Sequence, residues 1–82
     1  MIPDRRAMPA YQRRAIAKMK AAIPVSGFRP ATEAEWEKLQ EASVELAAAG
    51  YRAAGATKAQ AWRAARATMG GPAGRIILEI NF

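Results

Sequence analysis

Two clusters of basic side chains are the part of this sequence best suited to chemistry. The first cluster is Arg13, Arg14, Lys18 and Lys20, and the second is Lys58, Arg63 and Arg66 with Gln60 among them. Lysine and arginine displace the counterions condensed on a nucleic acid, and this release supplies most of the sequence-independent affinity. Both clusters are therefore candidates for contacts with phosphate groups.

The groups on which most enzymes depend are absent from the sequence. It has no cysteine and no histidine, which removes disulfides, thiolate metal ligands, the commonest zinc ligand and the commonest general base. Asp4 is the single aspartate, and no hydroxyl has an obvious base beside it. We therefore expect a binding protein rather than an enzyme, with no catalytic residue, no metal and no cofactor.

The net charge of +6 at pH 7 is distributed unevenly along the chain. Residues 1–30 carry seven basic side chains and one acidic, residues 31–50 one basic and five acidic, and residues 51–82 five basic and one acidic. If the basic ends fold together, they form a positive face for nucleic acid. Alternatively, the central glutamates neutralise their neighbours and leave an ordinary solvated surface. An acidic protein surface would respond to the same positive field.

Three helices are predicted, over about residues 9–22, 33–54 and 58–69. Pro9 suits the first position of a helix, where its missing N–H costs nothing. Residues 32–35 (TEAE) and 57–60 (TKAQ) have the capping-box pattern, in which threonine and a glutamate or glutamine three residues later satisfy each other's backbone N–H groups. Gly50 lies inside the second helix, which we expect to continue through it at a cost of about 1 kcal/mol relative to alanine.

The C-terminal residues 74–82 (GRIILEINF) follow a different period. Ile76, Leu78, Ile80 and Phe82 occupy every second position, and this alternation predicts a β-strand over residues 75–81. A lone strand cannot satisfy its backbone groups, so its partner would be residues 23–28, a second copy of the chain, or the sheet edge of another protein. The expected fold is mainly α, with one small domain over residues 9–82 behind a basic arm at 1–8.

Large apolar side chains are scarce because alanine dominates the sequence. The candidates for the core are Trp36, Leu39, Val44, Leu46, Tyr51, Trp62, Met69, Ile76, Ile77, Leu78, Ile80 and Phe82. The two tryptophans stand at helical spacing, which is typical of buried anchors. A core with so few large side chains often needs a partner surface. We therefore expect a homo-oligomer or a subunit of a complex.

Residues 51–69 combine the end of a helix, a glycine turn and a second, capped helix. Gly55 stands in the turn, Thr57 caps the following helix, and Ala61 and Ala64 occupy its small inward positions. This organisation resembles the helix-turn-helix of repressors and of the small subunits of phage packaging terminases, over about a quarter of the chain. The same pattern fits two alanine-rich helices folded against each other.

The resemblance implies a DNA-binding regulator that contacts duplex DNA. A helical wheel centred on Trp62 assigns the sides of this helix differently from the motif, because it leaves Ala64 facing outward together with Gln60, Arg63 and Ala67, with Lys58 and Arg66 at the edges of the core face. Gln60 and Arg63 would then contact base edges. Arg5 and Arg6 would enter the minor groove as an arm, and the cations of residues 13–20 would contact phosphates.

The alternative is a protein-binding inhibitor or an accessory subunit. Proteins of this size are common in phages and mobile elements, and some block bacterial nuclease defence. Such a protein would use the alanine-rich face, or add its last strand to a partner's sheet; a structural subunit of a larger assembly is a third class. No apolar run approaches the roughly 20 residues needed to span a bilayer, so we expect a cytoplasmic protein with no membrane partner.

Overall fold

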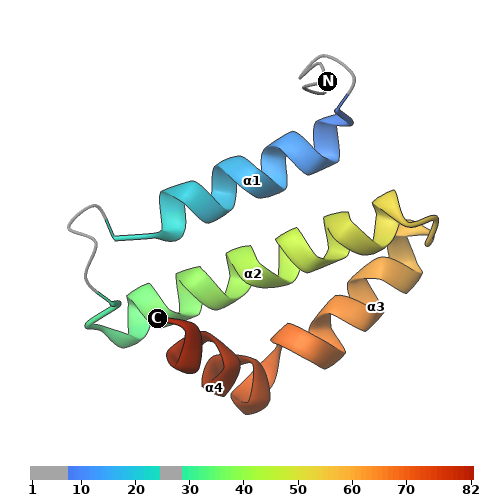
Figure 1. Cartoon of the computed structure of the whole chain (residues 1–82). Helices are drawn as coiled ribbons and strands as arrows, with labels where there is room; N and C mark the ends of the chain where they lie inside the picture. Colours follow the sequence, from blue (N-terminus) through green and yellow to red (C-terminus); the bar gives the residue numbers. More distant parts are fainter. Residues whose placement is uncertain (1–7, 25–28) are drawn as a thin grey trace.

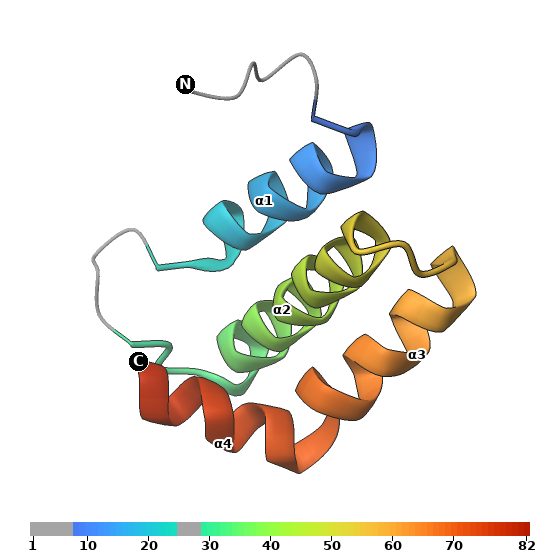
Figure 2. The same ribbon diagram turned by 45° about the vertical axis from the view of Figure 1, so that its right-hand side comes forward.

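Four helices make up the part of the chain that the structure describes, and three of them are arranged around the longest (Figure 1). The computed structural model describes residues 8–24 and 29–82. The helices are α1 (Ala10–Ala22), α2 (Glu33–Ala53), α3 (Lys58–Met69) and α4 (Gly71–Asn81). α1 lies along one side of α2 and α3 along another, while α4 contacts both α3 and α2 (Figure 2).

The three predicted helices are confirmed, with ends within about one residue of those expected. The Thr57 hydroxyl accepts the Gln60 N–H at 3.2 Å, and the Gln60 amide oxygen accepts the Thr57 N–H at 3.1 Å, so this capping box is complete. The Thr32 hydroxyl accepts the Glu35 N–H at 3.2 Å but donates to the Glu35 carboxylate at 3.1 Å, which replaces the second half of the predicted box. α2 continues through Gly50, as expected.

The core consists of two clusters spaced along α2. One cluster contains Ala22, Trp36, Leu39 and Ala42, with Met19 and Leu78 packed against it. The other contains Val44, Ala48, Ala61 and Ala65, with Trp62 and Met69 among the residues packed against it. Alanine fills most positions where the helices meet, so α1 and α3 approach α2 closely. Several large residues expected in the core therefore lie exposed, namely Tyr51, Ile76, Ile77, Ile80 and Phe82.

The predicted C-terminal strand over residues 75–81 is wrong, because these residues belong to α4. Pro72 lies in the first turn of this helix, where its missing N–H is tolerated. A Cβ on Gly74 would collide with the Met69 carbonyl, so glycine allows α4 to pack against the end of α3. Within the described residues the structure contains no β-strand. A strand here would have no partner among them, whereas a helix satisfies its backbone groups internally.

Two of the predicted segments fall mainly on residues that the structure does not describe. The suggested pairing segment at 23–28 is described only at Ile23 and Pro24, and the basic arm at 1–8 only at Met8. Across 8–24 and 29–82, none of the helices combines the length and the apolar character that crossing a membrane requires.

Candidate nucleic-acid interface

Five basic side chains line two adjoining hollows, one where the start of α1, the end of α2 and the start of α3 meet, and one along α3. A cavity of about 140 Å³ where the three helices meet is lined by residues that include Tyr11, Arg14, Arg52, Lys58 and Trp62. An open depression along α3 is lined by Lys58, Ala59, Trp62, Arg63 and Arg66. Because the two hollows share Lys58 and Trp62, they form one continuous surface. We name it the basic face and define it by its cations, Arg14, Arg52, Lys58, Arg63 and Arg66.

Aromatic rings hold two of these cations in place. The Arg52 guanidinium carbon lies 3.8 Å from the centroid of the Tyr11 ring, and that of Arg66 lies 5.4 Å from the Trp62 ring. The electron-rich face of an aromatic ring attracts a cation at such distances. Each guanidinium is therefore positioned by a contact that leaves its N–H donors available for an anion.

The turn between α2 and α3 brings Lys58 into the same cavity as Arg52. Gly55 adopts a φ of +110° in this turn, a conformation that glycine adopts without steric cost because it has no Cβ. The Thr57 capping box then starts α3 at Lys58. The sequence of glycine, threonine cap and lysine thus sets the position of the first cation on α3.

The glutamates leave the basic face almost unopposed. Within the described residues, Glu45 is the only carboxylate that lines it. A carboxylate oxygen of Glu45 lies 2.9 Å from the Lys18 ammonium, which also lies 3.3 Å from Glu41. The hydrogen bond with Glu45 is the main reason that the pKa of Lys18 is raised. In the part of the chain that the structure describes, no cation of the basic face forms an ion pair.

Other acidic groups are neutralised near α4, away from the basic face. Arg75 donates to both carboxylate oxygens of Glu33, at 2.7 and 2.8 Å, and to Glu79 at 3.2 Å. The hydrogen bonds between Arg75 and Glu33 lower the pKa of Glu33 and raise that of Arg75. The guanidinium groups of Arg75 and Arg29 lie 5.3 and 5.4 Å from the Trp36 ring. Charge is therefore largely balanced beside α4 and strongly positive beside the α2–α3 turn.

The structure brings together only part of the predicted phosphate-binding set. Lys18 is held in ion pairs with Glu41 and Glu45. Arg5 and Arg6 lie outside the described residues. The predicted residues that the structure places on the basic face are Arg14, Lys58, Arg63 and Arg66.

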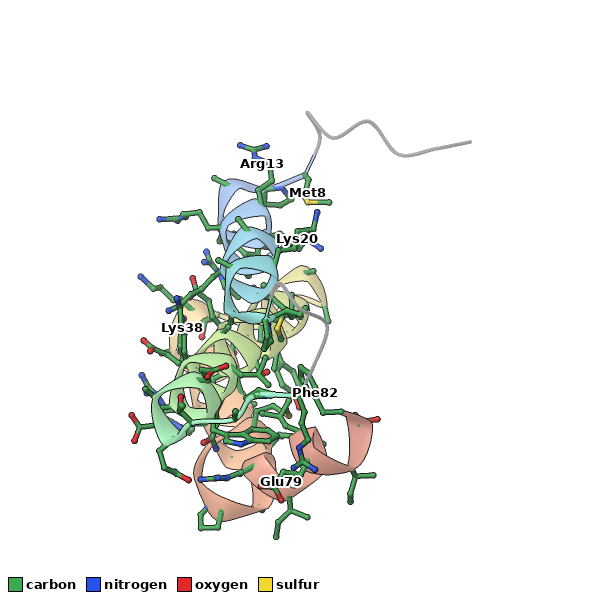
Figure 3. All side chains as sticks on the ribbon, turned by 90° about the vertical axis from the view of Figure 1, so that its left-hand side faces the viewer. Met8, Arg13, Lys20, Lys38, Glu79 and Phe82 are labelled. Atoms are coloured by element: carbon green, nitrogen blue, oxygen red, sulfur yellow. The ribbon has the colours of Figure 1, made fainter. Side chains whose placement is uncertain are left out.

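Arg13 and Lys20 lie on a different side of α1. With Met8, Ile16 and Ala17 they line a separate hollow, and Figure 3 shows Met8, Arg13 and Lys20 together at the α1 edge of the molecule. The Arg13 guanidinium donates to the Met8 carbonyl at 2.6 Å. The cations of α1 therefore do not form one face.

Arg52 completes the basic face, although no sequence pattern predicted it as a binding residue. Its position in the last turn of α2, just before the glycine turn that leads to Lys58, is the signal that could have indicated it. The contact between Arg52 and the Tyr11 ring could not be predicted from the position of Arg52 in the sequence, because it depends on α1 lying antiparallel to α2.

α2 and α3 form an antiparallel hairpin. The side-chain amide of Gln40 donates to the Met69 carbonyl at 3.0 Å and to the Gly71 carbonyl at 2.6 Å. Ala61 and Ala65, which are fully buried, pack against α2. The helices of a helix-turn-helix cross at about 90–120°. Gln40 and Met69 both lie far from the turn, and each residue advances a helix by about 1.5 Å, so such a crossing would separate them by roughly 25 Å. This segment therefore has the second arrangement considered above, two alanine-rich helices folded against each other.

The outward face of α3 differs from the predicted wheel because Trp62 is not at the centre of its buried face. Ala61 and Ala65 hold that place, and Trp62 is half-buried beside them, as is Ala64. Gln60 is exposed, but its amide oxygen accepts the Thr57 N–H. Gln60 cannot offer both its donor and its acceptor to an adenine without giving up the cap.

The comparisons with known proteins found no relative of this chain. No protein-family model, no curated protein and no solved structure matches the chain. Among residues 8–24 and 29–82, no three acidic side chains are placed to hold a metal ion. The basic face is therefore interpreted from its geometry and its charge.

Proposed function

We propose that the protein binds nucleic acid by placing the basic face against the phosphate backbone of duplex DNA. The observation that carries this proposal is the convergence of five cations from three helices on one surface. Within the described residues, these cations have no acidic partner. Four of the five are arginines, whose planar fork of N–H donors matches the geometry of phosphate oxygens.

Contact with the backbone is favoured over stacking on exposed bases. Proteins that hold single strands present aromatic faces on which bases stack. In this structure Tyr11 has Arg52 over its ring and Trp62 has Arg66 over its ring, so each ring has one face already occupied. Phosphates remain the groups that the surface is best equipped to bind. This role would place the protein in the cytoplasm together with the DNA.

Binding of this kind has little sequence preference. α3 lies flat along α2 and is held there by Gln40, so it does not stand out as a helix that could enter the major groove. Sequence is read at base edges, whereas phosphate contacts fix only position and register. We therefore propose a DNA-binding protein whose affinity depends on charge and, through it, on salt.

The dependence of affinity on salt tests this function directly. If all five cations contact phosphates, the logarithm of the association constant falls with the logarithm of salt concentration at a slope of up to about −4.5. Fluorescence anisotropy of a labelled short duplex gives this slope. An absence of binding at low salt would end the proposal.

A matched pair of lysine substitutions locates the surface. Lys58 and Lys38 are both exposed helical lysines, but Lys38 lies in the first half of α2 and lines neither hollow of the basic face. We expect Lys58→Ala to weaken binding several-fold and to reduce the steepness of the salt slope by about 0.9. Lys38→Ala should change both much less. Equal effects of the two substitutions would show that net charge, and not this surface, governs binding.

Protein binding is the alternative function, and one of the two surfaces expected for it, the C-terminal strand that would have joined a partner's sheet, does not form. On the alanine-rich outward side of α3, Ala67 is exposed and Ala64 is half-buried. The basic face could still attract an acidic protein. Affinity purification of the tagged protein before and after nuclease digestion separates the two functions, since our proposal requires nucleic acid in the undigested eluate.

A further inference from the structure

The two hollows of the basic face differ in size and in shape. The cavity between α1, α2 and α3 has a volume of about 140 Å³ and is the more enclosed of the two, whereas the depression along α3 has about 620 Å³ and is open to solvent. Lys58, the first residue of α3, lines both of them. The cavity therefore adjoins one end of the depression, as a small enclosed site at the end of an open path.

The cavity has a surplus of positive charge. Three cations line it, one from each helix, and they are Arg14 of α1, Arg52 of α2 and Lys58 of α3. Glu45 is the one carboxylate among the described residues that line it, and the Lys18 ammonium lies 2.9 Å from its oxygen. The negative charge of Glu45 is therefore already balanced, and the three cations remain available to an anion.

These cations are placed before any ligand arrives. The Arg52 guanidinium lies 3.8 Å from the centroid of the Tyr11 ring, which restricts where its N–H donors can lie. Because α3 begins at Lys58, the positive end of the helix dipole also lies beside the cavity. A site that is organised in advance loses less conformational entropy when it binds its ligand.

A phosphate group at the end of a strand matches this site better than one within a strand. A phosphate monoester carries about −1.5 to −2 charges at pH 7, whereas each phosphate inside a strand contributes one negative charge. Three cations around one small cavity can therefore neutralise a monoester more fully than they are needed for a diester. A cavity accepts a water molecule once its volume exceeds about 10–15 Å³, so about 140 Å³ leaves room for a whole phosphate group.

We propose that the cavity binds the terminal phosphate monoester of a DNA strand, while the nucleotides that follow lie along the depression. This inference rests on the proposed function, and it names the part of the DNA that the basic face prefers. Lys58 and Arg66 both line the depression and stand about 12 Å apart along the axis of α3. This distance is the rise of about three or four nucleotides in one strand, so Arg63 and Arg66 can contact the phosphates that come next.

A free nucleoside monophosphate carries the same monoester and is the other source of such a group. It would occupy the cavity and leave Arg63 and Arg66 without a ligand. Because the cavity and the depression form one continuous surface, a strand end uses all five cations and a small molecule uses three. The continuity of the two hollows therefore favours the strand end.

Duplexes that differ only at their ends test the inference. One short sequence with an internal fluorophore is prepared with hydroxyl groups at every end, with 5′-phosphates or with 3′-phosphates, and anisotropy at one fixed salt concentration gives each Kd. At least one phosphorylated duplex should bind about tenfold tighter than the hydroxyl duplex, which is the effect of about one hydrogen bond to a charged group. Equal Kd values for the three duplexes would overturn the inference.

Two arginine substitutions assign the preference to the cavity. Arg14 and Arg63 are both exposed, but Arg14 lines only the cavity and Arg63 only the depression. Arg14→Ala should remove most of the preference for the phosphorylated end. Arg63→Ala should weaken the binding of every duplex and keep that preference, and circular dichroism checks that both variants are folded. An equal loss of preference in the two variants would contradict the assignment to the cavity.

The outcomes for the inference and for the proposed function are distinguishable. Salt-dependent binding that ignores the phosphorylation of the ends would sink the inference and leave the proposed function standing, whereas no binding of any duplex at low salt would end both. Calorimetric titration with a nucleoside monophosphate at the same salt concentration distinguishes the two sources of the monoester. It should bind at least about tenfold more weakly than the phosphorylated duplex, because it reaches fewer cations. Equal affinities would assign the cavity to a small molecule and overturn the inference.

Discussion

The Arg52 guanidinium lies 3.8 Å from the centroid of the Tyr11 ring, which ties the end of α2 to the start of α1. This contact explains how cations from distant parts of the sequence come to lie on one surface. It brings α1, with Arg14, beside the turn that leads to Lys58. The basic face is thus a product of antiparallel packing and not of one continuous basic segment.

Replacing Tyr11 by leucine should therefore destabilise the protein modestly. Tyr11→Leu keeps an apolar side chain and removes the ring beneath Arg52, so we expect a loss of about 0.5–1 kcal/mol in the free energy of unfolding. Urea denaturation measures this loss. Tyr51→Leu is the matched control, because Tyr51 is exposed, and it should change stability by less than about 0.5 kcal/mol. Equal losses at the two positions would show that the cation–π contact is not what matters.

Two glycines should respond to alanine with opposite signs. Gly50 lies inside α2, and a Cβ there meets no atom within 4 Å, so Gly50→Ala should stabilise the protein by about 0.5–1 kcal/mol. Gly55 has a φ of +110°, so Gly55→Ala should destabilise it by about 1 kcal/mol or more. The free energy of unfolding in urea gives both values. A stabilising Gly55→Ala would mean that the turn adopts another conformation in solution.

The helices that the sequence predicted correctly are those whose ends are marked by local signals. Thr32 and Thr57 cap their helices through side chains three residues from their partners, and such short-range contacts can be recognised without knowledge of the fold. The same holds for the continuation of α2 through Gly50, since its cost is small beside that of breaking a long helix.

α4 could not be assigned in this way because its sequence fits two periods. Ile76, Leu78 and Ile80 satisfy the alternation of a strand, while Ile76, Ile77 and Ile80 satisfy the spacing of a helix. The deciding contacts are distant in sequence. Gln40 bonds the carbonyls at the α3–α4 junction, and Arg75 bonds Glu33.

The basic face was predicted only in part for the same reason. Periodicity along one helix cannot show which cation meets a glutamate of another helix, as Lys18 meets Glu45. Nor can it show which side of α3 is buried, because alanines rather than Trp62 provide the contact with α2.

Acid should weaken the contact between Glu33 and Arg75. Arg75 holds the pKa of Glu33 below its ordinary value of 4.5. A carboxylate with a lowered pKa contributes its full stabilisation above the unfolded-state pKa and loses it as the pH falls through the folded-state pKa. The melting temperature of the unaltered chain should therefore fall more steeply below about pH 4.5 than that of Glu33→Gln.

A second glutamate provides the control for this pH dependence. Glu37 also lies exposed on the first half of α2 but forms no ion pair with any residue that the structure describes. Glu37→Gln should keep the steep acid limb of the unaltered chain. If Glu33→Gln and Glu37→Gln give the same curve, the bond with Arg75 does not contribute to the acid sensitivity.

Substitution of Gln60 distinguishes two roles for its side chain, which are capping α3 and contacting a base edge. Its amide oxygen accepts the Thr57 N–H at 3.1 Å, so Gln60→Ala should lower the free energy of unfolding by about 0.5–1 kcal/mol. Gln60→Glu preserves the acceptor and adds a negative charge at the positive end of the α3 dipole, so it should restore the stability. If Gln60 only caps the helix, Gln60→Ala should leave the ratio of affinities for two duplexes of different sequence unchanged. Anisotropy titrations with the two duplexes measure that ratio. If the ratio differs from one in the unaltered chain and in Gln60→Glu but falls to one in Gln60→Ala, α3 contacts base edges although it lies flat on α2.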